Sequence, residues 1–135
     1  MNPPDPAPSA AATPSPTPAG IGSHGETLAC EHLANLGLEV VARNWRINEG
    51  VVRGELDVIA LDHVNCLVVF VEVKTRRADG FGGPLAAVDR RKAARLRRLA
   101  MAFMAQAHLP YREVRFDVVG VRLDTRHLHH VVDAL

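Results

Sequence analysis

The sequence predicts a single α/β domain in which helices flank a mixed central sheet. Two amphipathic helical patterns, several short apolar runs with the alternation of strands, and turn residues between those runs support this class. The chain has 135 residues, 47% of them hydrophobic, which is enough apolar content to close one core. We therefore expect one folded unit.

The first twenty residues differ in composition from the rest of the chain. They contain seven of the nine prolines and otherwise mostly Ala, Ser and Thr, so they cannot bury enough surface to fold. We predict a disordered tail over residues 1–20 and one domain over residues 21–135. The tail lacks the basic start and apolar segment of a secretory signal, and the longest apolar run elsewhere, Cys66–Val71, is too short to span a bilayer. We expect a cytoplasmic protein that does not associate with membranes.

The first helix is expected between Ser23 and Gly37. Ser23 followed by Glu26 has the spacing of a capping box, and glycine is the usual residue after a last helical turn. Glu26 also shares a helical stripe with positions 29, 30 and 33, so it can instead face the sheet near Asp57. Both roles of Glu26 stay open. The helix is expected to bury three leucines, Leu28, Leu33 and Leu36.

Three strands should follow, joined by two turns. The first strand is expected over residues 38–46, the second leads from Arg53, and the third contains Phe70–Lys74. Turn residues at 48–50 and 62–65 separate them, which predicts a meander. The second and third strands are therefore expected to be neighbours.

The remainder of the chain predicts a loop, a long helix and two more strands. The glycine-rich residues 75–84 should form a mobile loop beside the third strand. Asp89 is a suitable N-cap for a helix that continues to Ala107, and residues 115–122 and 127–132 read as strands. The buried stripe of this helix is expected to contain Leu96, Leu99 and Phe103. Lys92 extends the stripe toward the sheet, so it can point at the acids of the central strands.

Charged residues occupy alternate positions in the two central strands. Because side chains in a strand repeat with a period of two, Glu55, Asp57 and Ile59 should share one face. By the same rule Glu72 should share a face with Lys74. If the two strands pair, their acids converge.

This convergence is suited to a divalent cation and a phosphodiester. Magnesium prefers oxygen ligands and usually completes its site with one or two carboxylates, water and a substrate phosphate. Asp57 and Glu72 are the candidate ligands for Mg²⁺ or Mn²⁺, and the carbonyl of Val73 could add another oxygen. Lys74 could orient the attacking water or stabilise the transition state. The pattern therefore indicates phosphodiester hydrolysis.

Structural interpretations of the same residues are weaker. Glu55 and Asp57 could lie on the solvated face of an edge strand, but the apolar run that follows them is typical of a core. Glu72 and Lys74 could form an exposed ion pair, which contributes only about 0–1 kcal/mol. Stability is thus a poor reason for charges at the end of a buried strand.

Several motifs in order resemble a known family. An acid, a spacer and Glu-Val-Lys resemble the PD-(D/E)xK nuclease superfamily, which has the restriction-endonuclease-like fold. More closely, residues 21–135 are similar to the YraN family of small bacterial proteins, which are regarded as Holliday-junction-resolvase-like. The matching motifs are GE at 25–26, NWR at 44–46, GELD at 54–57, FVEVK at 70–74, FGGP at 81–84, Lys92 and RFDVV at 115–119.

The resemblance implies roles for four residues. Asp57 and Glu72 match the two metal acids of the superfamily, Lys74 matches its lysine, and Glu26 matches the acid that many members carry on the first helix. An endonuclease that uses Mg²⁺ or Mn²⁺ is expected, with DNA as its substrate. The resolvase likeness adds branched DNA and a homodimer, because two symmetric cuts need two sites.

The charge distribution is compatible with nucleic acid. Net charge is only +1, yet from Lys74 to Arg98 nine Lys or Arg stand against two Asp, a local net of +7. Basic residues beside an acidic centre supply phosphate contacts, although a solvated helix face explains the arginines equally well. The candidate nucleic-acid contacts are Arg43, Asn44, Arg53, Arg76, Lys92 and Arg95.

Cysteine and histidine predict no further site. Cys30 and Cys66 are far apart and form no zinc pattern, so we expect small buried side chains. Asp117 should pair with Arg115 and is assigned no chemistry. A closed metal site needs four placed ligands, which the sequence does not supply around His127, His129 and His130.

Two rival functions remain open. The domain could be a non-catalytic module that binds nucleic acid or a protein partner on the same fold. The proline-rich tail could also bind a partner in extended form.

Overall fold

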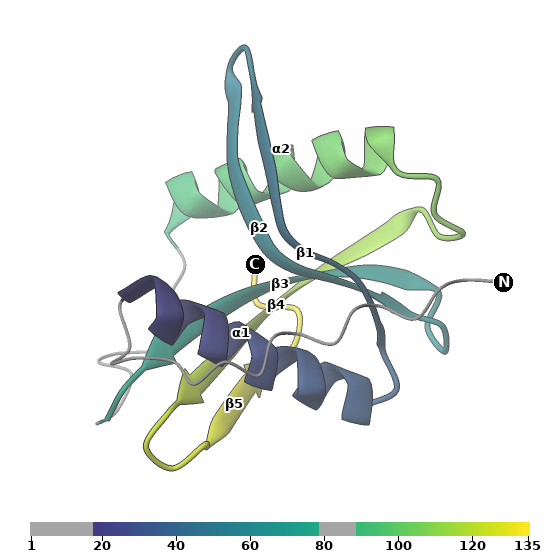
Figure 1. The fold of residues 1–135 in the computed structure, drawn as a ribbon. Helices are drawn as coiled ribbons and strands as arrows, with labels where there is room; N and C mark the ends of the chain where they lie inside the picture. The colour runs from purple at the N-terminus through teal and green to yellow at the C-terminus, as the bar shows by residue number, and fades with distance from the viewer. Residues whose placement is uncertain (1–17, 79–88) are drawn as a thin grey trace, which may run out of the picture.

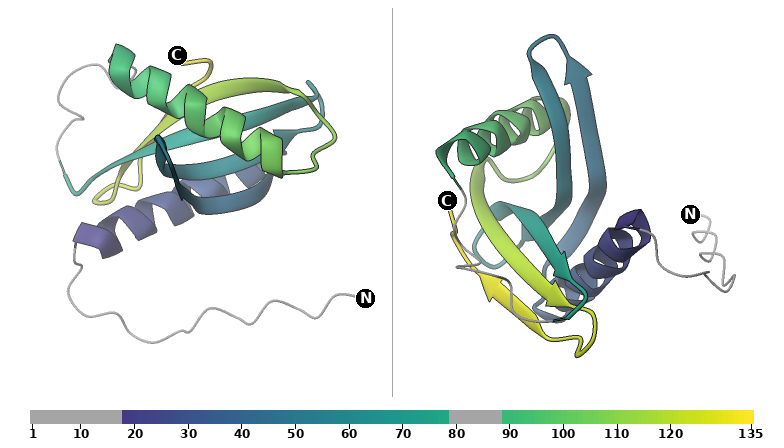
Figure 2. Two further views of the ribbon diagram at one scale, coloured as in Figure 1. Left: turned by 90° about the horizontal axis from the view of Figure 1, so that it is seen from above. Right: turned by 90° about the vertical axis from the view of Figure 1, so that its left-hand side faces the viewer.

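The chain folds into one five-stranded sheet between two helices, in a computed structural model that describes residues 18–78 and 89–135 and side chains from residue 22 onward (Figure 1). In Figure 2 the two helices lie on opposite faces of the sheet. This is the predicted α/β class, and it is consistent with a restriction-endonuclease-like fold. The elements in chain order are α1 (Pro18–Asn35), β1 (Glu39–Glu49), β2 (Val52–Asp62), β3 (Leu67–Arg76), α2 (Arg90–Gln106), β4 (Glu113–Arg122) and β5 (Leu128–Val131).

The sheet is mixed and has the order β1-β2-β3-β4-β5. The first three strands form the predicted antiparallel meander, and β5 is antiparallel to β4. Strands β3 and β4 are parallel, so the chain must cross over between them, and α2 lies in that connection. The β1–β2 hairpin extends beyond the rest of the sheet, beside α2 (Figure 1).

Each face of the sheet has its own core. Under α2, Leu99 and Phe103 pack with Leu56, Ile59 and Phe70 of the strands. The ring of Trp45 also meets Phe103 edge-on, with centroids 5.3 Å apart. Under α1, the buried cluster comprises Leu28, Ala29, Leu33, Val58, Val69, Val71, Val119 and Val121. The predicted buried stripe of α2 is confirmed, because Leu96, Leu99 and Phe103 are all buried.

Helix α1 differs from its prediction at both ends. It begins at Pro18, so three residues assigned to the tail are helical, and Ser23 lies inside the helix. Ser23 is therefore not an N-cap, and the capping-box interpretation was wrong. Leu36 is 55% exposed rather than buried, because it comes after the last turn.

The C-terminal end of α1 is the predicted glycine stop. Gly37 has φ +90°, a left-handed conformation that suits glycine. The N–H of Gly37 donates to the carbonyl of Ala34 at 2.9 Å, and that of Leu38 donates to the carbonyl of Leu33 at 3.0 Å. These two bonds form a Schellman motif.

The alternation of β2 breaks at Asp57. Leu56 and Ile59 are three residues apart yet both belong to the core under α2, which strict period two does not allow. Across the strand pair, Asn44 of β1 has φ +53° where the backbone turns out of the regular strand conformation. The prediction that Ile59 shares a face with Asp57 was therefore wrong.

The second helix is capped as predicted. The side chain of Asp89 accepts a hydrogen bond from the backbone N–H of Lys92 at 2.8 Å, and the helix ends at Gln106. Most of the predicted glycine-rich loop, residues 79–84, and the tail residues 1–17 lie outside the described residues. Within the described part of the chain, no helix has the length and apolar character needed to cross a membrane.

Candidate metal and phosphodiester site

The site lies where β2 separates from β3. Backbone pairing between these strands ends at Val58 and Val71, whereas β3 stays paired with β4 as far as Arg76. Beyond Val71 one edge of β3 is therefore no longer paired with β2. There the N–H of Val73 donates to Oδ2 of Asp57 at 2.9 Å, so a carboxylate replaces the missing strand partner.

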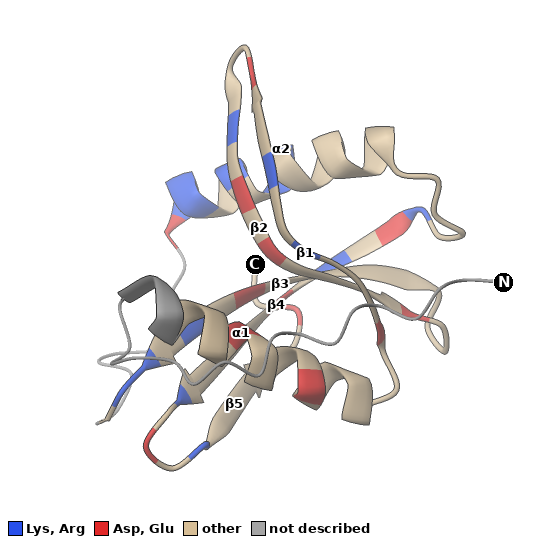
Figure 3. Ribbon diagram, in the orientation of Figure 1, with Lys and Arg blue, Asp and Glu red and all other residues tan. Residues whose placement is uncertain are grey.

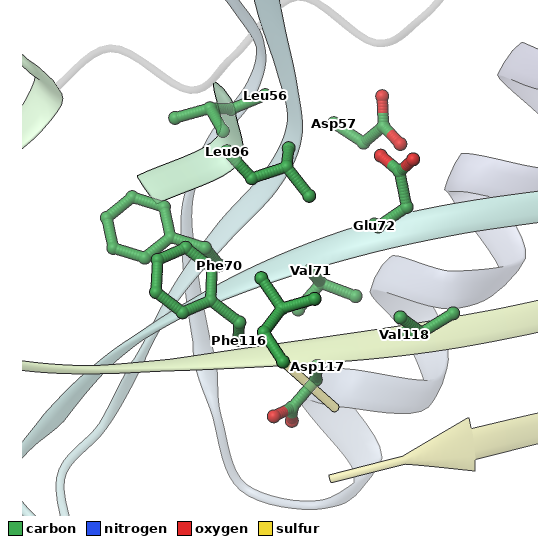
Figure 4. Close-up of a pocket in the computed structure, with 10 residues that line it drawn as sticks. Leu56, Asp57, Phe70, Val71, Glu72, Leu96, Phe116, Asp117 and Val118 are labelled. Atoms are coloured by element: carbon green, nitrogen blue, oxygen red, sulfur yellow. The ribbon is translucent and has the colours of Figure 1, made fainter. Parts of the chain in front are cut away.

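Asp57 and Glu72 converge as the sequence predicts. Figure 4 shows their carboxyl groups pointing toward one another from neighbouring strands. Burial, and then the charges of Glu72 and Glu26, raise the pKa of Asp57 to about 8. An acid in this position must hold a proton at neutral pH or share a bound cation with its neighbours.

Glu26 and Glu55 complete the acidic cluster. Together with Asp57, each offers one carboxylate oxygen, and these oxygens lie within 4.8 Å of one another. The sequence named Glu55 on the strand but gave it no role in the site. Its alternation with Asp57 was the signal that could have included it.

A close contact between α1 and β3 positions Glu26. Gly25 is buried, and a Cβ placed there would lie 2.0 Å from Oγ1 of Thr75. Glycine thus lets the helix backbone approach the sheet, and the next residue faces the acids. Of the two roles left open for Glu26, the geometry selects the one facing the sheet.

These residues fit a hard divalent cation. The donors are all carboxylate oxygens, the ligands that Mg²⁺ and Mn²⁺ prefer. Burial, and then the charge of Glu72, raise the pKa of Asp57, so a cation bound there would favour its ionised form. Asp57, Glu72, Glu26 and Glu55 are the residues that could hold such an ion.

Two lysines lie at the site. The ammonium of Lys92, from the first turn of α2, forms an ion pair with Oε2 of Glu72. The sequence named Lys92 as a nucleic-acid contact and also placed it on the helix stripe that faces the sheet, and this ion pair agrees with the second placement. Lys74 lies two residues beyond Glu72 on β3, is half-buried and is aligned with Gly120 of β4.

Two arginines of β1 pair with Glu26 and Glu55. Arg43 lies 3.8 Å from Glu26 and donates to Oγ1 of Thr27 at 3.3 Å. The guanidinium of Arg46 donates to Glu55 at 2.6 Å. Positive charge is therefore placed directly beside the acidic cluster.

An open hollow lies beside these pairs. It measures about 520 Å³ and brings residues of α1, β1 and β2 together: Gly22, Ser23, Glu26, Asn44, Arg46 and Glu55. Asn44 is one of the predicted nucleic-acid contacts, and here it lies next to the acids. A backbone phosphate in this hollow would meet both an amide and a guanidinium.

The other predicted contacts are spread more widely. Arg53 lines a second hollow, of about 470 Å³, along the hairpin with Arg46 and Glu55. Arg76 ends β3 and Arg95 lies on α2, and both are exposed. Figure 3 shows basic residues on the first half of α2 and along the hairpin, on either side of the acids.

Comparison with known proteins gives one family. Residues 25–121 match the family described as "Uncharacterised protein family UPF0102". A UPF0102 protein of Mycolicibacterium smegmatis is 50% identical over 107 residues, which cover 79% of this chain and 83% of the relative. One from Mycobacterium avium is 49% identical over 106 residues (78% and 80%), and one from Mycobacterium tuberculosis is 50% identical over 103 residues (76% and 77%).

Proposed function

This chain belongs to the UPF0102 family, the YraN family that its motifs resemble, and we propose that it is a metal-dependent endonuclease that hydrolyses phosphodiester bonds in DNA. The observation that carries the proposal is the environment of Asp57. Its carboxyl group receives one backbone hydrogen bond and otherwise faces other acids, beside a hollow that contains Asn44 and Arg46. Ionising such a group costs free energy unless a cation binds beside it.

Each residue has a proposed task. Asp57 and Glu72 hold Mg²⁺ or Mn²⁺, with Glu26 and Glu55 as outer acids that bind the ion or its water ligands. Once bound, such an ion makes hydroxide available and offsets charge on the phosphorus oxygens. Lys74 orients the attacking water and stabilises the transition state.

Asn44 and the basic residues around the cluster position the substrate. Asn44 and Arg43 contact the phosphate next to the scissile bond, and Arg53, Arg76 and Arg95 contact phosphates further along the strand. With a metal ion on Glu72, the ammonium of Lys92 would be available to contact a phosphate oxygen. Branched DNA as substrate, a homodimer with two sites and a cytoplasmic location complete the proposal.

A non-catalytic binding module is the second candidate. One observation favours it: Lys92, Arg43 and Arg46 already pair with Glu72, Glu26 and Glu55, respectively. These contacts offset the acidic charge without any metal. In that case the same surface would bind nucleic acid and cut nothing.

Cleavage of labelled DNA separates the two candidates. Four-way-junction, flap, single-stranded and duplex substrates are incubated with the full chain and Mg²⁺ or Mn²⁺. We expect cutting that falls about 100-fold or more in Asp57→Asn and in Lys74→Ala, and that is unchanged in the matched control Glu31→Gln, an exposed acid on α1. Binding without cutting, unaffected by Asp57→Asn, would instead support the binding module.

A further inference from the structure

Ligand-type side chains also meet at the other end of α1. His32 lies six residues beyond Glu26, about 9 Å along the helix axis. It meets His130 of β5, which in turn contacts the buried carboxylate of Asp117 on β4. None of these three residues has a task in the proposed endonuclease.

The two imidazoles face each other directly. Nε2 of His32 lies 3.0 Å from Nδ1 of His130, although 98 residues separate them in the chain. The rings meet edge-on, with centroids 5.1 Å apart and planes at 72°. Both residues are only partly buried, and the side chain of His130 is 10% exposed.

Asp117 fixes the orientation of the His130 ring. Arg115 donates two hydrogen bonds to this carboxylate, both at 2.9 Å, and the N–H of Asp133 donates a third at 3.0 Å. With three donors already present, the carboxylate is ionised and accepts the Nε2–H of His130 at 2.8 Å. In neutral His130, the lone pair of Nδ1 is therefore aimed at His32.

This is how proteins orient a metal-binding histidine. A ligating imidazole usually donates its other N–H to a carboxylate or carbonyl, which sets the tautomer and makes the ligand nitrogen more basic. Nitrogens bound tetrahedrally to zinc at about 2.0–2.1 Å lie about 3.3–3.4 Å apart. To bind an ion, Nε2 of His32 would release its proton to solvent or exchange it for one on Nδ1. Both rings would turn so that their lone pairs converge, and the separation of 3.0 Å would widen by a few tenths of an ångström.

We propose that His32 and His130 form a two-histidine site for a transition-metal ion of the class that prefers imidazole, such as Zn²⁺ or Ni²⁺. The hard ion Mg²⁺ prefers oxygen ligands and is not expected there. Within the described residues the one group of three or more Asp, Glu, His or Cys ligands is the acidic cluster at Asp57, so water completes the coordination. With two protein ligands, the affinity is expected to be moderate, in the micromolar range.

A bound ion would link α1 to β5. The helix is otherwise held at this end by the apolar contacts of Leu28 and Leu33. This link joins segments from opposite ends of the chain, so it should stabilise the folded state by an amount that rises with the logarithm of the metal concentration above Kd. This site does not depend on the proposed endonuclease function.

Calorimetric titration of the full chain with Ni²⁺ tests the site. The variants are His32→Gln and the control His129→Gln, which removes an exposed histidine next to His130. With excess Mg²⁺ present to fill the acidic cluster, we expect one Ni²⁺ per chain for the wild type and for His129→Gln, and affinity at least about 10-fold weaker for His32→Gln. Circular dichroism checks that each variant is folded, and Tm should rise with Ni²⁺ only where His32 is present.

A third variant separates this site from the acidic cluster. Asp57→Asn should keep the Ni²⁺ ion bound at the two histidines with the wild-type affinity, and excess Mg²⁺ should not compete for that ion. Equal binding by all variants, or binding that is lost in Asp57→Asn and kept in His32→Gln, overturns the proposal. So does the absence of binding to the wild type, which would leave a hydrogen bond between the two rings.

Discussion

Asp57 and Asp117 occupy the same sheet but have opposite surroundings. Asp117 is 1% exposed and accepts hydrogen bonds from Arg115, His130 and the N–H of Asp133. Although burial alone would raise its pKa, these bonds hold the pKa of Asp117 below the ordinary value. Asp57 accepts one N–H and faces Glu72 and Glu26, which help burial to raise its pKa.

The difference shows how a structural acid can be distinguished from a functional one. The fold compensates the charge of Asp117 fully, so this residue ties β4 to β5 and to the turn after it. Among the described residues, Asp57 accepts one backbone N–H and lies beside acids, so ionising it costs stability unless a cation binds. Replacing Asp117 by Asn should therefore lower the free energy of unfolding, and replacing Asp57 by Asn should raise it.

The largest expected effect is at the compensated acid. Asp117→Asn should lower the free energy of unfolding by about 3–5 kcal/mol, because it removes the closer of the two carboxylates that pair with the partly buried Arg115 and the charge that His130 contacts. Urea unfolding followed by circular dichroism measures this loss. The matched control is Asp124→Asn, which breaks an exposed pair with Arg122 and should cost no more than about 1 kcal/mol. Equal losses of stability in Asp117→Asn and Asp124→Asn would mean that the contacts of Asp117 contribute no more than an exposed ion pair.

A smaller effect is expected where α1 meets the acidic cluster. Gly25→Ala places a methyl group against Thr75 and should cost about 1–3 kcal/mol of stability, because the helix must move away from β3. The same movement withdraws Glu26 from the acids. Gly22→Ala, in open space on the same helix, should instead be stabilising by about 0.5–1 kcal/mol. Thermal unfolding of the pair measures the difference, and a stabilising Gly25→Ala would contradict the close approach.

Neutralising Asp57 should stabilise the protein. Asp57→Asn keeps the acceptor for the N–H of Val73 and removes a charge beside Glu72, so at pH 8 it should raise the free energy of unfolding by about 1–2 kcal/mol. Urea unfolding in the presence of EDTA measures the gain. Adding Mg²⁺ should then stabilise the wild type and leave the variant unchanged. A destabilised variant would mean that Asp57 has a compensating partner.

The pH dependence sharpens the contrast further. The pKa of Asp57 is raised from 3.8 to about 8, so the folded state holds an extra proton between these values and loses stability as pH rises through that window. The pKa of Asp117 is lowered, so its contribution is present above pH 3.8 and is lost as pH falls below that value. Wild type minus Asp57→Asn stability should therefore decline from pH 5.5 to pH 8. A flat difference across this range would argue against a perturbed Asp57.

Much of the fold could be predicted because its signals are local. The alternation of the strand residues, the N-cap Asp89 and the stop at Gly37 each depend on a few neighbouring positions. The meeting of Asp57 and Glu72 followed from the short turn between their strands, which makes them neighbours. Ser23 and Leu36 were misassigned because the helix starts earlier and ends sooner than its local pattern suggests.

The sequence by itself determined the class of the fold, the order of its elements and the pair of acids on the two central strands. Only the tertiary structure decided which side chains meet across elements. It placed Glu55 and Glu26 beside Asp57, turned Lys92 onto Glu72 and brought His32 against His130. The physical reason is that side-chain direction after a break in alternation, as at Asp57, and contacts between distant segments depend on packing rather than on local spacing.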